Sequence, residues 1–142
     1  MKIIITSFDS FLKLLPTMDS NEMSMLHSMI AKNDYTGKTV AYIPGVNSEN
    51  SLLGVVIFSS KDKKATIHTL CVRDCVKNRG LGTKLVDTVK AGNDFVSVNG
   101  IRDALGFYIK NGFIPKDDIL DLVVRLEWNR RTESRENPGT RR

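Results

Sequence analysis

Residues 70–85, LCVRDCVKNRGLGTKL, begin as an apolar strand and end as an amphipathic helix. Between these halves stand Arg73, Lys77 and Arg79, followed by Gly80 and Gly82. The first amides of a helix have no partner within the helix, and with the helix dipole they form a natural seat for phosphate. Glycine keeps side chains away from that seat and permits the turn. The stretch therefore predicts a phosphate-binding loop between a strand and a helix.

The sequence of this loop excludes two common nucleotide motifs. The order Gly-x-x-x-x-Gly-Lys-Ser/Thr of a Walker loop does not occur in the chain. A dinucleotide fingerprint would need a third glycine at position 85, which is Leu85. A glycine turn whose charges face water remains an alternative, because short glycine patterns often arise by chance.

The charge of the chain is unevenly distributed. Its net charge is +5 over 142 residues, and residues 129–142 hold five arginines against two glutamates, leaving only +2 for the rest. Nucleic-acid binding would need basic residues clustered in the folded part and interleaved with aromatics. We therefore expect one domain over residues 1–128 and a basic, disordered tail over 129–142. Nucleic-acid binding through the tail is kept as the weaker alternative.

The sequence carries no clear signal peptide, membrane helix or cysteine-based metal motif. The apolar run at the N-terminus is too short for a signal peptide, and no window approaches the roughly 20 apolar residues of a membrane helix. We therefore predict a cytoplasmic protein without a membrane partner. Cys71 and Cys75 have no second pair to complete a metal site, so we expect free thiols and no metal.

Hydrophobic periodicity predicts an α/β fold with a mixed, α+β-like sheet. Alternating or β-branched runs favour strands, and apolar residues at helical spacing favour helices, with Gly112 as a C-terminal stop. Short-linked strands followed by βαβ crossovers describe a mixed sheet. The predicted strands are residues 2–5, 38–45, 52–60, 65–72, 94–99 and 120–128, with a turn at 60–64. The main predicted helices are 19–33, with Ser20 as its N-cap, 81–91 and 101–112.

Two motifs resemble signatures of the GNAT superfamily of N-acetyltransferases. KNRGLG (77–82) resembles the acyl-CoA loop [QR]-x-x-G-x-[GA], and it follows an L-x-V strand at 70–72. ALGFYIKNGF (104–113) is similar to the second signature, A-x-x-x-Y-x-x-x-G-F. The resemblance covers about residues 40–128. Lys77 departs from the usual Gln or Arg; it keeps the charge but loses the bidentate fork.

The resemblance implies a GNAT fold with six to seven strands, splayed in the middle and flanked by about four helices. It also implies acetyl-CoA as cosubstrate, with its pantetheine arm on the backbone of Leu70 and Val72 and its diphosphate on the amides of residues 78–83. A backbone amide near Leu70 or Cys71 would polarise the thioester carbonyl. The implied cofactor-binding residues are Leu70, Cys71, Val72, Lys77, Asn78, Arg79, Gly80, Leu81, Gly82 and Thr83.

The implied reaction is direct attack of a primary amine on acetyl-CoA in a ternary complex. Tyr108 occupies the family's usual acid position, where it would protonate the CoA thiolate. His68 is the candidate base, because it precedes Leu70 by two residues on one strand face and has an ordinary pKa near 6.5. Core packing is the structural alternative for both residues.

The acceptor is left open by the sequence. Asp117, Asp118 and Asp121 form an acidic cluster that could attract a cationic amine, although a solvated turn is the interpretation we favour. A polyamine, an arylalkylamine, a protein lysine and a protein N-terminus fit equally well. The alternative function is a catalytically idle acyl-CoA-binding module, and the chain is expected to be a monomer or a homodimer.

Overall fold

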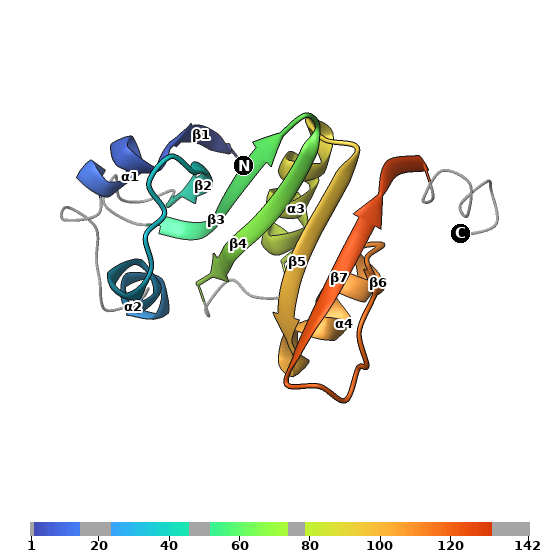
Figure 1. Cartoon of the computed structure of the whole chain (residues 1–142). Coiled ribbons are helices and arrows are strands. Elements are labelled where there is room, and N and C mark those ends of the chain that lie inside the picture. The colour runs from blue at the N-terminus through green and yellow to red at the C-terminus, as the bar shows by residue number, and fades with distance from the viewer. Residues whose placement is uncertain (1, 15–23, 46–51, 74–78, 132–142) are drawn as a thin grey trace. The chain divides into compact units, whose positions relative to one another are not determined.

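The computed structural model describes residues 2–14, 24–45, 52–73 and 79–131. In these ranges seven strands form a mixed sheet in the order β1-β2-β3-β4-β5-β7-β6, accompanied by four helices (Figure 1). The predicted mixed fold of six to seven strands and about four helices is confirmed. The strands are β1 (Ile4–Ser7), β2 (Thr39–Pro44), β3 (Leu52–Lys61), β4 (Lys64–Val72), β5 (Phe95–Ile101), β6 (Ile114–Pro115) and β7 (Val123–Asn129). The helices are α1 (Phe8–Leu14), α2 (Ser24–Lys32), α3 (Leu81–Ala91) and α4 (Arg102–Lys110).

The sheet is mixed because one of its strand pairs is parallel. β4 pairs in parallel with β5, whereas β1 with β2, β2 with β3, β5 with β7 and β6 with β7 are antiparallel. A parallel pair needs a crossover connection, and α3 lies in the segment that joins β4 to β5. The glycine loop therefore precedes the crossover helix of a βαβ unit, as its position between strand and helix predicts.

The chain divides into two compact units. The first comprises Met1–Ser59 and His68–Thr88, and the second comprises Ser60–Ile67 and Val89–Arg142.

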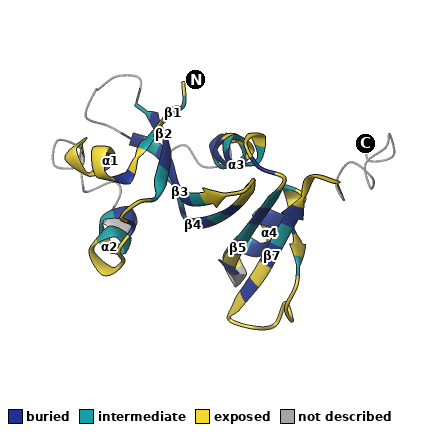
Figure 2. Cartoon of the chain, turned by 45° about the horizontal axis from the view of Figure 1, so that its top comes forward, coloured by how far each residue is buried: buried dark blue, intermediate teal, exposed yellow. Residues whose placement is uncertain are grey.

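In the first unit, the sheet is packed on both faces. Val40 and Tyr42 of β2 share one buried cluster with Phe11 of α1, and all three are almost completely enclosed. On the opposite face, Leu85 of α3 packs over Gly54 of β3. Figure 2 shows buried residues along both β2 and β3. Burial on both faces explains why β3 reads as a continuous apolar run.

The first strand begins later than predicted, at Ile4 rather than Lys2. Its pairing with β2 runs from Ile4↔Tyr42 to Ser7↔Thr39, so the tertiary partner sets its limits. The Ser7 hydroxyl then accepts a hydrogen bond from the amide of Ser10 (3.1 Å) and thereby caps α1. The predicted N-cap of the next helix, Ser20, lies outside the described residues.

In the second unit, β5 and β7 form the central pair. Burial alternates along β7, where Val124, Leu126 and Trp128 are enclosed and the intervening residues are more accessible (Figure 2). Gly100 of β5 is tightly packed: a Cβ there would lie 3.0 Å from Leu126 Cδ1. One face of this pair is therefore the core of the unit.

The end of β7 extends beyond the predicted domain boundary at residue 128. Asn129 belongs to the strand, and Arg130 is anchored by its side chain, which donates to the carbonyl oxygens of Lys90 (2.6 Å) and Asn93 (2.9 Å). Arg130 Nε also lies 3.4 Å from Asp94 Oδ1. Three residues of the predicted tail, 129–131, are therefore part of the described structure.

Candidate active site

The start of α3 has the geometry expected of an anion-binding loop. Gly80 has φ +78°, a left-handed conformation that strongly favours glycine, and α3 begins at the next residue. The amide of Lys84 donates to the Gly80 carbonyl (3.1 Å), which makes Gly80 the residue that opens the helical ladder. The amides of Leu81, Gly82 and Thr83 therefore precede the first intrahelical donor.

The surroundings of these amides also fit a phosphate ligand. Arg79 and Gly80 are exposed, whereas Gly82 and Thr83 are half-buried. A Cβ added at Gly80 would meet no atom within 4 Å, so this part of the loop is open. A helix N-terminus with its dipole and a neighbouring guanidinium attracts negative charge. The predicted phosphate ligands Lys77 and Asn78 lie outside the described residues.

The position of α3 depends on a close approach to the sheet. A Cβ at Gly54 would lie 3.1 Å from Leu85 Cδ1, 3.4 Å from the Cys71 carbonyl oxygen and 3.6 Å from Val72 Cγ2. A side chain at Gly54 would therefore press on the helix or on the end of β4. Because Gly54 of β3 has no side chain, Leu85 can pack closely against it and hold α3 on the sheet. The first turn of α3 carries the candidate phosphate-binding amides.

The strand residues predicted to hold the pantetheine arm lie at the end of β4. Leu70, Cys71 and Val72 are all half-buried. The recorded register of β4 with β5 runs from Lys64↔Phe95 to Ile67↔Val98, and β4 continues to Val72 beyond it. Leu70 and Val72 therefore lie in the last part of β4, after the residues that pair with β5 in this register.

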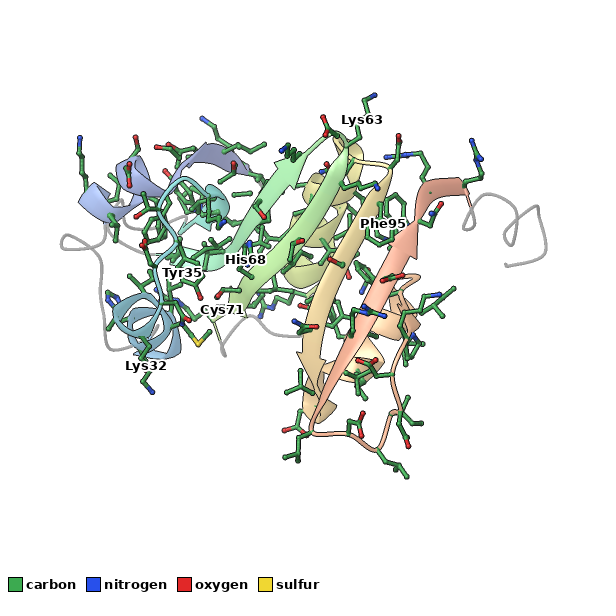
Figure 3. The ribbon with its side chains drawn as sticks, in the orientation of Figure 1. Lys32, Tyr35, Lys63, His68, Cys71 and Phe95 are labelled. Carbon is green, nitrogen blue, oxygen red and sulfur yellow. The ribbon has the colours of Figure 1, made fainter. Side chains whose placement is uncertain are left out.

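His68 lies in the first unit with its ring held by a polar contact. Its Nε2 is 2.9 Å from the hydroxyl oxygen of Ser59 in β3, and its ring centroid lies 6.3 Å from that of Tyr35 (Figure 3). Burial lowers the pKa of His68 below its ordinary value, and the positive charge of Lys38 lowers it further. Both effects favour the neutral imidazole, which is the form that can accept a proton.

Sequence reasoning missed the polar network next to His68. The hydroxyl of Tyr35 lies 2.7 Å from Thr69 Oγ1, and both side chains are buried. Ser59 and Tyr35 approach β4 from 9 and 34 residues away along the chain, respectively. Neither residue belongs to a motif, so no sequence pattern indicates these contacts.

Tyr108, the predicted acid, lies in the second unit on α4. Its side chain is 5% exposed, and its ring contacts Phe107 and Phe113 edge-on, with centroids 5.1 and 5.4 Å away. The predicted core packing of this aromatic residue is therefore present. A buried ring can still direct its hydroxyl toward a reacting group, so this packing is compatible with the catalytic role.

The predicted site residues are thus divided between the units. The described part of the phosphate loop, the end of β4 and His68 lie in the first unit, and Tyr108 lies in the second.

Two carboxylates of the acidic cluster between β6 and β7 accept hydrogen bonds from backbone amides. Asp117 accepts a hydrogen bond from the amide of Arg125 (3.0 Å), and Asp118 accepts one from the amide of Leu120 (2.9 Å). Both carboxylates remain exposed. These contacts give Asp117 and Asp118 a role in shaping the turn.

None of the described helices combines the length and apolar character needed to cross a membrane. Within the described ranges, no group of three His, Cys, Asp or Glu side chains is arranged to hold a metal ion.

Comparisons with known proteins agree with the fold. Residues 43–108 match the family model described as the acetyltransferase (GNAT) domain, PanZ. No curated protein sequence matches the chain significantly. Among solved structures, Tetrahymena GCN5 is 19% identical with a TM-score of 0.62, covering 91% of this chain and 96% of its own. An acetyltransferase of the GNAT family from Staphylococcus aureus Mu50 is 17% identical with a TM-score of 0.56, covering 91% and 99%. The IAA acetyltransferase from Bacillus cereus ATCC 14579 is 17% identical with a TM-score of 0.57, covering 90% and 99%.

The family match extends from Ile43 in β2 to Tyr108 in α4 and includes the glycine loop. At these identities the solved structures establish the shared fold. The family model thus matches the central part of the chain, and the fold of the chain is the GNAT fold.

Proposed function

We propose that the chain is an acetyl-CoA-dependent N-acetyltransferase that acts on a primary amine. The observation that carries this proposal is the start of α3. Gly80, in a left-handed conformation, opens the helix, and the amides of Leu81, Gly82 and Thr83 precede its hydrogen-bond ladder. The match of residues 43–108 to a GNAT acetyltransferase domain supports acyl-CoA as the anion that this arrangement would hold.

The proposed cofactor site has two parts. The diphosphate is held by amides of residues 78–83 with countercharge from Lys77 and Arg79. The pantetheine arm lies along the backbone of Leu70 and Val72, while an amide near Cys71 polarises the thioester carbonyl. The half-buried end of β4 and the exposed loop at Gly80 support this assignment.

Transfer requires that the amine loses protons and that the departing thiolate gains one. An alkyl ammonium has a pKa of roughly 10, so the amine must lose a proton before its nitrogen attacks the carbonyl. His68 accepts that proton, and its lowered pKa keeps it neutral at neutral pH. The new C–N bond replaces the C–S bond, and Tyr108 protonates the departing thiolate. The nitrogen then loses its second proton, which restores the phenol of Tyr108.

The proposal is tested by turnover with a panel of amines. CoA release from acetyl-CoA is measured with polyamines, arylalkylamines, a histone-tail peptide and peptides with free N-termini. We expect release with at least one class, and Tyr108→Phe should lower kcat by about 10²–10⁴-fold while acetyl-CoA affinity is unchanged. Tyr42→Phe is the matched control, because it removes a hydroxyl from another buried tyrosine.

Two outcomes would contradict the proposal. Binding of acetyl-CoA without CoA release for any amine would indicate the idle acyl-CoA-binding module. Equal turnover by Tyr108→Phe and Tyr42→Phe would remove Tyr108 as the acid.

A further inference from the structure

A groove in the second unit lies at the tip of the β3–β4 hairpin. Its volume is about 700 Å³, within the range of small-molecule sites. The hairpin turn, the start of β5 and the end of β7 line it, and its cationic side chains are Lys63, Lys64, Arg130 and Arg131. Figure 3 labels two lining residues, Lys63 and Phe95. None of these residues belongs to the proposed acetyl-CoA site.

Backbone hydrogen bonds join the segments that line this groove. The carbonyl of Lys63 accepts from the amides of Asp94 (2.8 Å) and Phe95 (3.3 Å). The carbonyl of Asp94 in turn accepts from the amide of Arg130 (2.9 Å). Three segments that are distant in sequence are therefore joined, and the lining side chains start from a well-defined backbone.

The hairpin turn holds a lysine in an unfavourable conformation. Asp62 and Lys63 have φ +54° and +65°, as in a type I′ turn, where Asn-Gly is preferred. A lysine is strained in this region of backbone conformation, and such strain clusters at functional sites. Lys63 is one of the residues that line the groove.

The charges of the groove are only partly neutralised. Arg130 is engaged by Asp94 and by two backbone carbonyls at the end of α3. Lys63, Lys64 and Arg131 are exposed, and none of the three forms an ion pair with another described residue. Asp62 is the remaining carboxylate in the lining. Three cations therefore face one unengaged acid, which favours an anionic ligand.

An aromatic ring adjoins these cations. Phe95 pairs with Lys64 on one side and with Asn129 on the other, and paired residues of adjacent strands share a face of the sheet. Phe95 is half-buried, so part of it is accessible. Aromatic side chains beside clustered cations are suited to a base attached to phosphates.

We propose that this groove is a second ligand site that binds a nucleotide unit, with its phosphates on Lys63, Lys64 and Arg131 and its base against Phe95. The same chemistry is offered by a free nucleotide and by single-stranded nucleic acid. The size of the groove favours the free nucleotide.

The test measures binding of labelled ATP and of a labelled single-stranded oligonucleotide by fluorescence anisotropy, using the full chain. The double variant Lys63→Asn/Lys64→Gln removes two charges, and Asn tolerates the left-handed turn. We expect its affinity to fall by about tenfold or more. Lys110→Gln/Lys116→Gln, which removes two exposed lysines outside the groove, should leave affinity unchanged.

One further variant distinguishes binding of the base from binding of the phosphates. A second distinguishes the groove from the proposed acetyl-CoA site. Phe95→Leu should weaken ATP binding but leave tripolyphosphate binding intact. Gly82→Trp should retain ATP binding, because it alters only the proposed acetyl-CoA loop. For a strand, the groove variant should also lower the slope of log affinity against log salt by about 0.7 per lost contact.

Each outcome decides the proposal. A loss confined to the groove variant supports it, with ATP identifying a free nucleotide and the oligonucleotide identifying a strand. Equal losses in the two lysine pairs, or loss of ATP binding in Gly82→Trp with the groove variant unaffected, would overturn it. Absence of binding by all three probes at millimolar concentration would overturn it as well.

Discussion

His68 shows how local surroundings prepare a side chain for proton transfer. Ser59 contacts Nε2, and burial together with Lys38 lowers the imidazole pKa. The neutral ring is therefore retained to a lower pH than that of an ordinary histidine. The contact also restrains the ring, because Ser59 lies on the neighbouring strand β3.

The lowered pKa of His68 predicts a pH dependence of both stability and rate. The unfolded state binds a proton near pH 6.5 and the folded state only at lower pH. Protonation therefore favours unfolding, and the free energy of unfolding should fall as pH decreases through about 6.5 toward the lowered folded pKa. His68→Gln should remove this contribution, as denaturant titrations at pH 7.5 and 5.5 would measure.

The same variant tests the proposed base. Acetylation by His68→Gln should be slower than wild type near neutral pH and should recover partly at high pH, where the amine loses its proton unaided. An unchanged pH–rate profile would assign His68 to packing alone, while the stability effect would remain.

The crossover helix α3 links the glycine loop to the sheet. Its seat is the contact of Leu85 with the bare backbone of Gly54, where a Cβ would be only 3.1 Å from Leu85 Cδ1. Cores tolerate little additional volume, because their side chains are already close-packed. The position of the candidate phosphate-binding amides at the start of α3 therefore depends on Gly54 in β3.

A double-mutant cycle tests this dependence. Gly54→Ala should destabilise the protein by about 1–3 kcal/mol through overpacking and should weaken acetyl-CoA binding by displacing α3. Leu85→Val removes the nearest carbon atom, so in the double variant it should offset part of the first change. The expected coupling of about 0.5–3 kcal/mol is measured by denaturant unfolding of all four proteins.

If the two changes in the free energy of unfolding were strictly additive, the proposed contact between Gly54 and Leu85 would be contradicted. A stability loss with unchanged acetyl-CoA affinity would instead separate the packing of α3 from cofactor binding.

For the whole molecule, sequence patterns predict elements better than they predict their partners. The glycine loop and the helical spacing of Leu81, Leu85 and Val89 correctly predict a strand–loop–helix. The start of β1 is missed by two residues, because its pairing with β2 decides it. Local propensity carries no information about such a partner.

Contacts between distant segments cannot be predicted from the sequence for the same reason. The Ser59–His68 and Tyr35–Thr69 contacts form only when different segments meet. The turn at residues 60–64 is predicted from the sequence, yet the groove also needs Asp94 and Asn129 from distant segments. Division of the chain into a domain of residues 1–128 and a tail of 129–142 stays a prediction, although Arg130 already contacts the end of α3.

The most direct test of the central claim is acetyl-CoA binding measured by isothermal titration calorimetry. Wild type is compared with Gly82→Trp, at the start of α3, and with Gly92→Trp, just past its end, where an added Cβ would meet no atom within 4 Å. Circular dichroism confirms that both variants fold. We predict equal binding by wild type and Gly92→Trp and no detectable binding by Gly82→Trp. Wild-type affinity in Gly82→Trp, or no binding by wild type itself, would contradict the claim that the opening amides of α3 hold the cofactor.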